Sequence, residues 1–217
     1  MARALGLVLD LAFAGFVAVT DSEGHPLVRH WRPPGARYDD IAEWIHDGLA
    51  EAGGVFSDLA WICVGVGPGS FTGIRIAMAF AQGLALPGEL PLYGFTSFAP
   101  LLLSGTSPAE GLSEERRLAI IPANTGRFYA ASDLQDPGRL VDAEEGIRLA
   151  DSETILSVPS ITASLNPILP GFKRVHSVED RWDVLALVDY ARTSSRDAYH
   201  PYYLQLSAAE AKLPGSI

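Results

Sequence analysis

Apolar runs, turn residues and helix-spaced apolar positions follow one another in a similar order in both halves of this chain. Short apolar runs bounded by turn residues predict strands, and apolar positions three or four residues apart predict helices. In the first half, the expected strands cover 5–10, 15–20, 27–31, 59–65 and a short stretch near 92, and the expected helices cover 39–52, 71–86 and 97–103. The strand at 59–65 is apolar throughout, which is typical of a central strand covered on both faces.

The second half repeats this order less clearly. Strands are expected at 117–121, 127–132, 161–163 and 172–175, with one more at either 139–141 or 146–149, and helices at 151–156 and 180–192. The repetition indicates a duplicated unit rather than a short-period repeat. The polar stretch 103–111 is the natural linker, which predicts one half at 1–103 and a smaller, more divergent half at 104–217. The predicted fold class is α/β, with mixed sheets flanked by helices.

The segment VGVGPGSFTGIRIA, residues 64–77, joins an apolar strand to a helix through a glycine-rich turn. Glycines around Pro68 can take backbone angles that other residues avoid, and Ser70 or Thr72 can cap the helix. The free N–H groups of a helix start also suit an anion, but a Walker-type loop needs a lysine where this chain has Ile74. The segment therefore favours a tight corner that sets the helix, with phosphate binding as the alternative.

The helix expected at 71–86 is apolar on nearly every side, and only Arg75 and Gln82 are strongly polar. A helix that is apolar all round is buried all round. One side can pack on its own sheet, so the other side is expected to meet a second subunit, with burial inside this chain as the alternative. The predicted partner surface consists of Trp44, Ile74, Met78, Ala81, Gln82 and Ala85.

Charge and cysteine content argue against a protein that binds nucleic acid by itself and against a disulfide-stabilised protein. The chain of 217 residues has 26 acidic and 16 basic residues, so it lacks the basic surface that independent binding of nucleic acid requires. Its one cysteine, Cys63, lies in an apolar run and is expected to be a buried, inert thiol, which fits a reducing cytoplasm. Asp10 interrupts the apolar N-terminal stretch, which favours two strands over a signal peptide, and no membrane span is expected.

The corner and the helix after it resemble the signature of the TsaB family. The resemblance lies in GPGSFTGIRIAMAFAQGLAL at 67–86, and LGLVLD at 5–10, IIPANTGRFYAA at 120–131 and HPYYLQ at 200–205 add to it. It covers nearly the whole chain and is weakest between 133 and 195. It implies a fold like that of actin, Hsp70 and sugar kinases (the ASKHA superfamily, ribonuclease H-like), built from two duplicated halves.

The resemblance also implies a function. TsaB is a non-catalytic subunit that binds and activates TsaD for transfer of a threonylcarbamoyl group to adenosine 37 of tRNA. The implied partners are a TsaD-like enzyme and a TsaE-like ATPase, with tRNA only indirectly and a homodimer through the N-terminal helices as a further option. ATP or ADP is expected only in the assembled complex, and neither a catalytic residue nor a metal site is expected. The residues that match the family motif, a candidate loop facing a nucleotide, are Gly67, Pro68, Gly69, Ser70, Phe71, Thr72, Gly73 and Arg75, together with Asp10.

Departures from the family pattern bear on the catalytic alternative, an ATPase, a kinase-like enzyme or a glycoprotease-like enzyme. The first strand often ends Asp-Thr-Ser in the family, whereas here Leu11 and Ala12 follow Asp10. Two hydroxyls that would face a nucleotide are therefore missing. Asp10 has two interpretations: a residual contact to a metal-bound water, or an acid that caps the turn after its strand. The five histidines have no metal-motif spacing.

Overall fold

The structure is a computed structural model. It describes residues 4–13, 15–32, 38–104, 117–123, 126–149, 155–158, 174–177, 182–194, 198 and 200–204. For the strands at 155–158 and 174–177 only the backbone is described.

The first half is a five-stranded sheet in the order β3-β2-β1-β4-β5. Its strands are β1 (Leu5–Asp10), β2 (Gly15–Asp21), β3 (Pro26–Arg32), β4 (Leu59–Gly67) and β5 (Leu92–Thr96). The first three strands form an antiparallel meander, and β4 and β5 continue the sheet in parallel with β1. Strand β4 lies inside the sheet with eight of its nine residues buried, which confirms the prediction from its continuous apolar run.

The second half is also a five-stranded sheet, in the order β10-β9-β6-β7-β8. Its strands are β6 (Arg117–Pro122), β7 (Phe128–Ala131), β8 (Arg139–Val141), β9 (Ile155–Val158) and β10 (Arg174–Ser177). Renumbered from its first strand, this sheet has the same order and the same directions as the first sheet. The duplication expected from the sequence is thereby confirmed at the level of topology.

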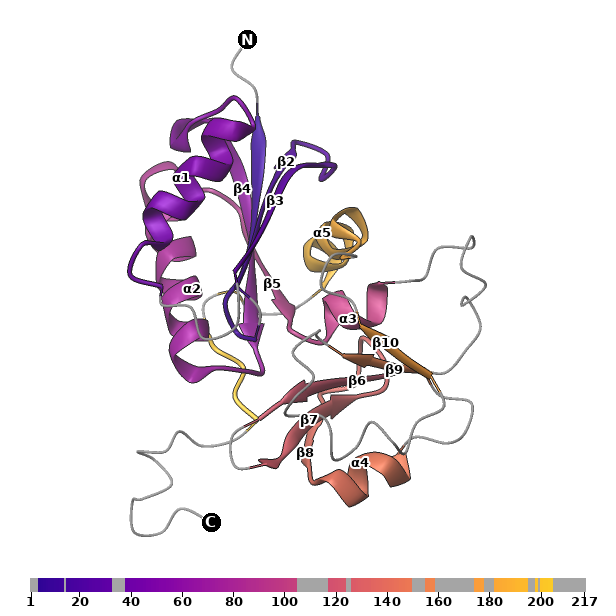
Figure 1. Cartoon of the computed structure of the whole chain (residues 1–217). Helices are drawn as coiled ribbons and strands as arrows, with labels where there is room; N and C mark the ends of the chain where they lie inside the picture. Colours follow the sequence, from indigo (N-terminus) through magenta and orange to yellow (C-terminus); the bar gives the residue numbers. More distant parts are fainter. Residues whose placement is uncertain are drawn as a thin grey trace, which may run out of the picture.

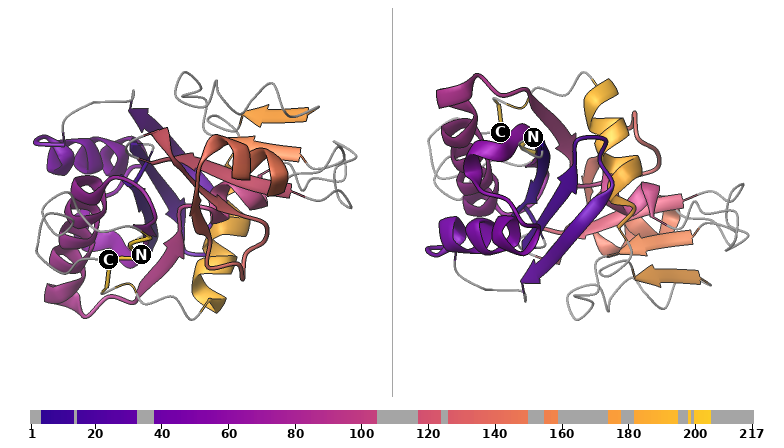
Figure 2. Two further views of the ribbon diagram at one scale, coloured as in Figure 1. Left: turned by 90° about the horizontal axis from the view of Figure 1, so that it is seen from below. Right: turned by 90° about the horizontal axis from the view of Figure 1, so that it is seen from above.

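Helices cover the two faces of the first sheet in separate layers (Figures 1 and 2). Helices α1 (Ile41–Glu51) and α2 (Phe71–Ala85) share one face, and α2 continues into a short 3-10 turn at Leu86–Gly88. The opposite face is covered by α5 (Val184–Thr193), which contacts β5 and α3 (Ala99–Leu103). Since α3 also contacts β6, α3 and α5 lie between the two sheets and join the halves.

Helix α5 packs on the first sheet although it follows the second sheet in the sequence. This helix belongs by sequence to the segment 104–217, but Leu187, Val188 and Trp182 pack with Phe16 on the first sheet. Trp182 lies 4.5 Å from Phe16 and 4.9 Å from Trp31 between ring centroids. The chain therefore returns to the first half after completing the second.

For the second half, the structure decides one open choice and corrects one expectation. The strand expected at either 139–141 or 146–149 is β8 at 139–141, and residues 146–149 lie in α4 (Ala143–Leu149). A helix does not run to Leu156, because Ile155–Val158 is strand β9. The strand expected at 161–163 and most of the linker at 103–111 lie outside the described residues.

Candidate functional site

The corner between β4 and α2 packs tightly against the loop that follows β1. Ser70 caps α2 as predicted, because its hydroxyl accepts a hydrogen bond from the Gly73 amide at 3.2 Å. The Ser70 amide in turn donates to the carbonyl of Ala12. Two of the amides at this helix start therefore already have acceptors within the chain, which favours the tight corner over a phosphate loop.

Glycine is required in the corner because other backbone segments come too close for a side chain. A Cβ on Gly69 would lie 2.3 Å from the Ala12 carbonyl oxygen, and one on Gly73 would lie 1.9 Å from that of Leu11. Gly67 has a φ of +107° and accepts a hydrogen bond from the Ser97 amide at 2.9 Å. The glycines of the motif are thus explained by contacts inside this chain.

Asp10 ends β1 beside this corner and is fully buried. Its carboxylate accepts hydrogen bonds from the Ala12 amide at 2.6 Å and the Ser97 hydroxyl at 3.4 Å. Burial raises the pKa of Asp10 to about 7, although the hydrogen bonds from Ala12, Ser97 and Phe13 act in the opposite direction. This geometry supports the turn-capping interpretation of Asp10.

The side of α2 that the sequence predicts to meet a partner is the side that the structure buries. Ile74, Met78, Ala81 and Ala85 are between 0% and 5% exposed and pack into the core between α2 and the sheet. The expectation that these four residues form a partner surface is therefore corrected: they hold α2 on its own sheet. The sequence left this open because both sides of the helix are apolar, so periodicity alone could not choose between them.

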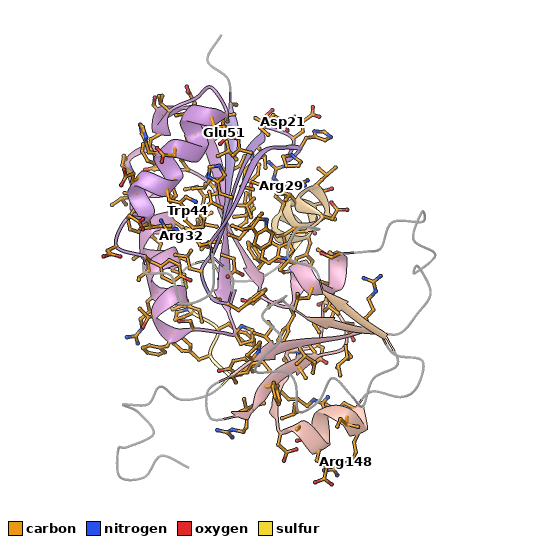
Figure 3. All side chains as sticks on the ribbon, viewed as in Figure 1. Asp21, Arg29, Arg32, Trp44, Glu51 and Arg148 are labelled. Carbon is orange, nitrogen blue, oxygen red and sulfur yellow. The ribbon has the colours of Figure 1, made fainter. Side chains whose placement is uncertain are left out.

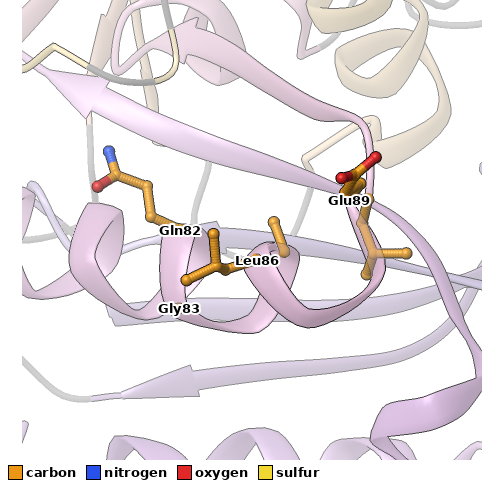
Figure 4. Close-up of a pocket in the computed structure, with 6 residues that line it drawn as sticks. Gln82, Gly83, Leu86 and Glu89 are labelled. Carbon is orange, nitrogen blue, oxygen red and sulfur yellow. The ribbon is translucent and has the colours of Figure 1, made fainter.

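The outer side of α2 is formed by other residues. Exposed along it are Thr72, Arg75, Ala79, Gly83 and, directly after the helix, Leu86. Leu86 is 79% exposed and borders an open hollow of about 500 Å³ at the end of the helix (Figure 4). Gln82, which was predicted to face a partner, also lines this hollow.

A segment near the C-terminus lies along the start of α2. The Tyr203 ring stacks on Phe71 with 4.8 Å between centroids, and its hydroxyl accepts a hydrogen bond from Arg75 Nε at 3.1 Å. Tyr202 donates its amide to the Val66 carbonyl at 2.8 Å. The sequence signalled this segment only through the string HPYYLQ and did not indicate where it docks.

The outer side of α1 is acidic. Its exposed carboxylates are Glu43, Asp47 and Glu51, spaced four residues apart and therefore on one side of the helix. The Trp44 ring is half-buried, with the Arg32 guanidinium 4.7 Å from its centroid, and Glu51 contacts His30 at 2.8 Å (Figure 3). Trp44 is thus partly accessible, whereas the carboxylates dominate the surface.

Other candidate chemistry is accounted for by packing. Burial raises the pKa of the Cys63 thiol to about 12, which confirms the inert thiol predicted from its apolar run. Within the described residues, no cluster of three or more metal-ligating side chains occurs. None of the helices described is long and apolar enough to cross a membrane.

Comparisons with known proteins place the fold and the family. A family model for TsaD, tRNA N6-adenosine threonylcarbamoyltransferase, matches residues 38–161, more than half of the chain. This chain belongs to that family. It is similar to the tRNA threonylcarbamoyladenosine biosynthesis protein TsaB of Escherichia coli (strain K12), with 36% identity over 105 residues. It is also similar to TsaB of Buchnera aphidicola subsp. Schizaphis graminum, with 41% identity over 44 residues.

These sequence matches are partial. The match to the E. coli protein covers 48% of this chain and 44% of that protein, and the match to the Buchnera protein covers 20% and 21%. Both of these relatives are TsaB proteins, which confirms the resemblance to the TsaB family seen in the corner and α2.

Solved structures extend the likeness in fold to nearly the whole chain. YeaZ from Pseudomonas aeruginosa has a TM-score of 0.64 and 22% identity, with 92% of this chain and 99% of that chain covered. A crystal structure of an uncharacterized protein with similarity to peptidase YEAZ, from the same organism, has a TM-score of 0.66 and 22% identity, covering 94% and 100%. Together with the two matching sheets, these likenesses confirm the duplicated ASKHA-like α/β fold.

Proposed function

We propose that this chain is a non-catalytic subunit of the machinery that makes threonylcarbamoyladenosine on tRNA, and that it binds and activates a TsaD-like enzyme. The names of its TsaB relatives support the role in this biosynthesis. The observation that carries the binding role is the exposed outer side of α2, which ends in Leu86 beside an open hollow. The partner performs the chemistry, and this chain stabilises the partner's competent state by binding that state more tightly.

The outer side of α2 has the features of a helix-packing surface. Ala79 and Gly83 are small, and a Cβ on Gly83 would meet nothing within 4 Å, so a partner helix has room to approach closely. Leu86 exposes most of its apolar surface, and burying such a side chain contributes about 1.5–3 kcal/mol. Ile76 and Phe80, half-buried along the same helix, add apolar area.

The acidic side of α1 bears on which partner fits. Glu43, Asp47 and Glu51 would meet like charges if a second copy packed its own α1 against them, which is unfavourable. A partner with basic residues opposite α1 would form favourable charge pairs with these carboxylates. We therefore propose the TsaD-like enzyme, rather than a second copy of this chain, as the partner. The tRNA binds to the assembled complex rather than to this chain alone, since the chain carries a formal charge of -10. A TsaE-like ATPase joins the same complex.

A non-catalytic role agrees with how the motif residues are used. Asp10 holds the loop after β1, and the amides of Ser70 and Gly73 are bonded within the chain. Catalysis of phosphoryl transfer or hydrolysis needs such groups to be free for substrate. The name of one solved structure mentions a peptidase, and a peptidase assay on the purified chain tests that alternative directly.

Substitution of Leu86 by aspartate tests the proposed surface. Leu86→Asp places a charge where the partner would bury an apolar side chain, so we expect the affinity for the TsaD-like enzyme of the same organism to fall at least tenfold. The melting temperature should change little, because Leu86 is exposed in the isolated chain. Isothermal titration calorimetry with both proteins measures the affinity.

The matched control is Leu27→Asp, the same substitution at an exposed leucine on β3. It should leave the affinity unchanged. Undiminished binding by Leu86→Asp would remove α2 from the interface, and failure of the wild-type chain to bind or to stimulate tRNA modification would contradict the proposed function itself.

A further inference from the structure

We propose that Asp10 is a proton-linked positioning residue: it fixes the start of α2 through the loop 11–13, and loss of its proton loosens that connection. This inference deepens the proposed function, and only its consequence for binding of the partner rests on that function. Asp10 is fully buried at the end of β1, at a distance along the chain of sixty residues from Ser70. Its influence on α2 must therefore pass through contacts between segments.

The first route runs through the loop. Asp10 accepts the Ala12 amide at 2.6 Å, and the Ala12 carbonyl accepts the amide of Ser70, the residue that caps α2. The same carbonyl faces Gly69, and that of Leu11 faces Gly73, so closely that neither glycine has room for a Cβ. A shift of the loop therefore has to be matched by a shift of the corner and of the first turn of α2.

The second route runs through Ser97, directly after β5. Its hydroxyl lies 3.4 Å from the second oxygen of Asp10, and its amide donates to the Gly67 carbonyl at 2.9 Å. Gly65 faces the same carboxyl group, and a Cβ there would lie 2.6 Å from it. Asp10 is thus enclosed by β4, by Ser97 and by its own loop, and it is fully buried.

The surroundings of Asp10 supply dipoles but no compensating charge. From β4 the facing residue is Gly65, and from the end of β5 it is Ser97. Burial raises the pKa of the Tyr38 phenol, in the segment before α1, and the charge of Asp10 raises it further. The paired residue on β2 is Phe16. Within the described residues Asp10 makes no ion pair, so its ionised form is stabilised only by hydrogen bonds.

The sign of the pH effect follows from these contacts. Burial raises the pKa of Asp10 from 3.8 to about 7, so the closed corner binds a proton that an open, solvated corner releases. The stabilisation is complete below pH 3.8 and is lost as the pH rises through 7. Between pH 5.5 and 8.5 this linkage predicts an increase of about 30-fold in the fraction of molecules with the corner open.

Hydrogen exchange of the corner amides in the full-length chain tests the proposal. For residues 70–75 of the wild type, we expect protection factors to fall by about tenfold or more between pH 5.5 and 8.5. Asp10→Asn keeps the shape and removes the titration, so its protection factors should stay constant over this range. The control is Asp21→Asn, the same substitution at an aspartate whose carboxylate accepts three amides in the β2–β3 turn, away from α2 (Figure 3). It should retain the wild-type pH dependence at residues 70–75.

A flat wild-type profile, or an unchanged pH dependence in Asp10→Asn, would overturn the proposal. If Asp10→Asn does not fold, a carbon-13 titration of the Asp10 carboxyl in the wild type decides, since an apparent pKa near 4 contradicts the proposal and one near 7 supports it. A second arm measures affinity for the TsaD-like enzyme at both pH values. A wild-type chain that binds no TsaD at either pH contradicts the proposed function, whereas the exchange experiment still decides the role of Asp10.

Discussion

At the scale of single residues, backbone contacts explain the glycine-rich motif better than a ligand does. The sequence predicted a tight corner and a cap at Ser70 or Thr72, and Ser70 is the cap. The contacts to Ala12 and Leu11 could not be predicted, because they join segments sixty residues apart and leave no local signal. The glycines of the corner are recognisable from the sequence, whereas the backbone segments that they contact are seen only in the structure.

Substitution of Gly69 by valine tests this explanation. Gly69→Val should destabilise the chain by a few kcal/mol, because its Cβ would overlap the Ala12 carbonyl. Gly83→Ala provides a matched control on the exposed side of α2, where a Cβ meets nothing and a gain of about 0.5–1 kcal/mol is expected. Urea unfolding gives the free energy of unfolding of both variants. Equal free energies for Gly69→Val and Gly83→Ala would show that a side chain fits in the corner and would contradict this explanation.

At the scale of elements, the order of strands and helices in the first half was predictable and the facing of α2 was not. Helices α1 and α2 and all five strands of the first sheet occur where apolar periodicity placed them. For α2 the two sides are nearly equally apolar, so the choice of Ile74, Met78, Ala81 and Ala85 as buried residues depends on packing against β1 and β4. The error at Leu156 has a similar cause, since a short apolar run fits a strand or a helix.

Met78 distinguishes the two sides of α2 experimentally. Met78→Asp buries an unpaired carboxylate between α2 and the sheet, so we expect it to destabilise or unfold the isolated chain by several kcal/mol. A thermal melt of the isolated chain, compared with that of Leu86→Asp, measures the difference. A stable Met78→Asp chain that fails only in binding the partner would reverse our assignment of the two sides.

At the scale of the whole molecule, the last helix of each half lies between the two sheets and contacts the other half. Helix α3 contacts the second sheet and α5 packs on the first, which leaves the outer layer of α1 and α2 as the face pointing away from the second half (Figures 1 and 2). The duplication was readable from the sequence, whereas the return of α5 was not, because Trp182 and Leu187 look like any core residues. Within the described residues, the outer side of α2 beyond its first turn and the outer side of α1 remain exposed.

Hydrogen exchange of the chain alone and in complex with the TsaD-like enzyme tests the central claim most directly. We predict that protection on binding is concentrated in residues 72–86, along α2 and directly after it, and in the exposed side of α1, with the second sheet and α5 unchanged. Protection confined to the second half, with 72–86 exchanging as in the isolated chain, would contradict the claim that α2 presents its outer side to a partner.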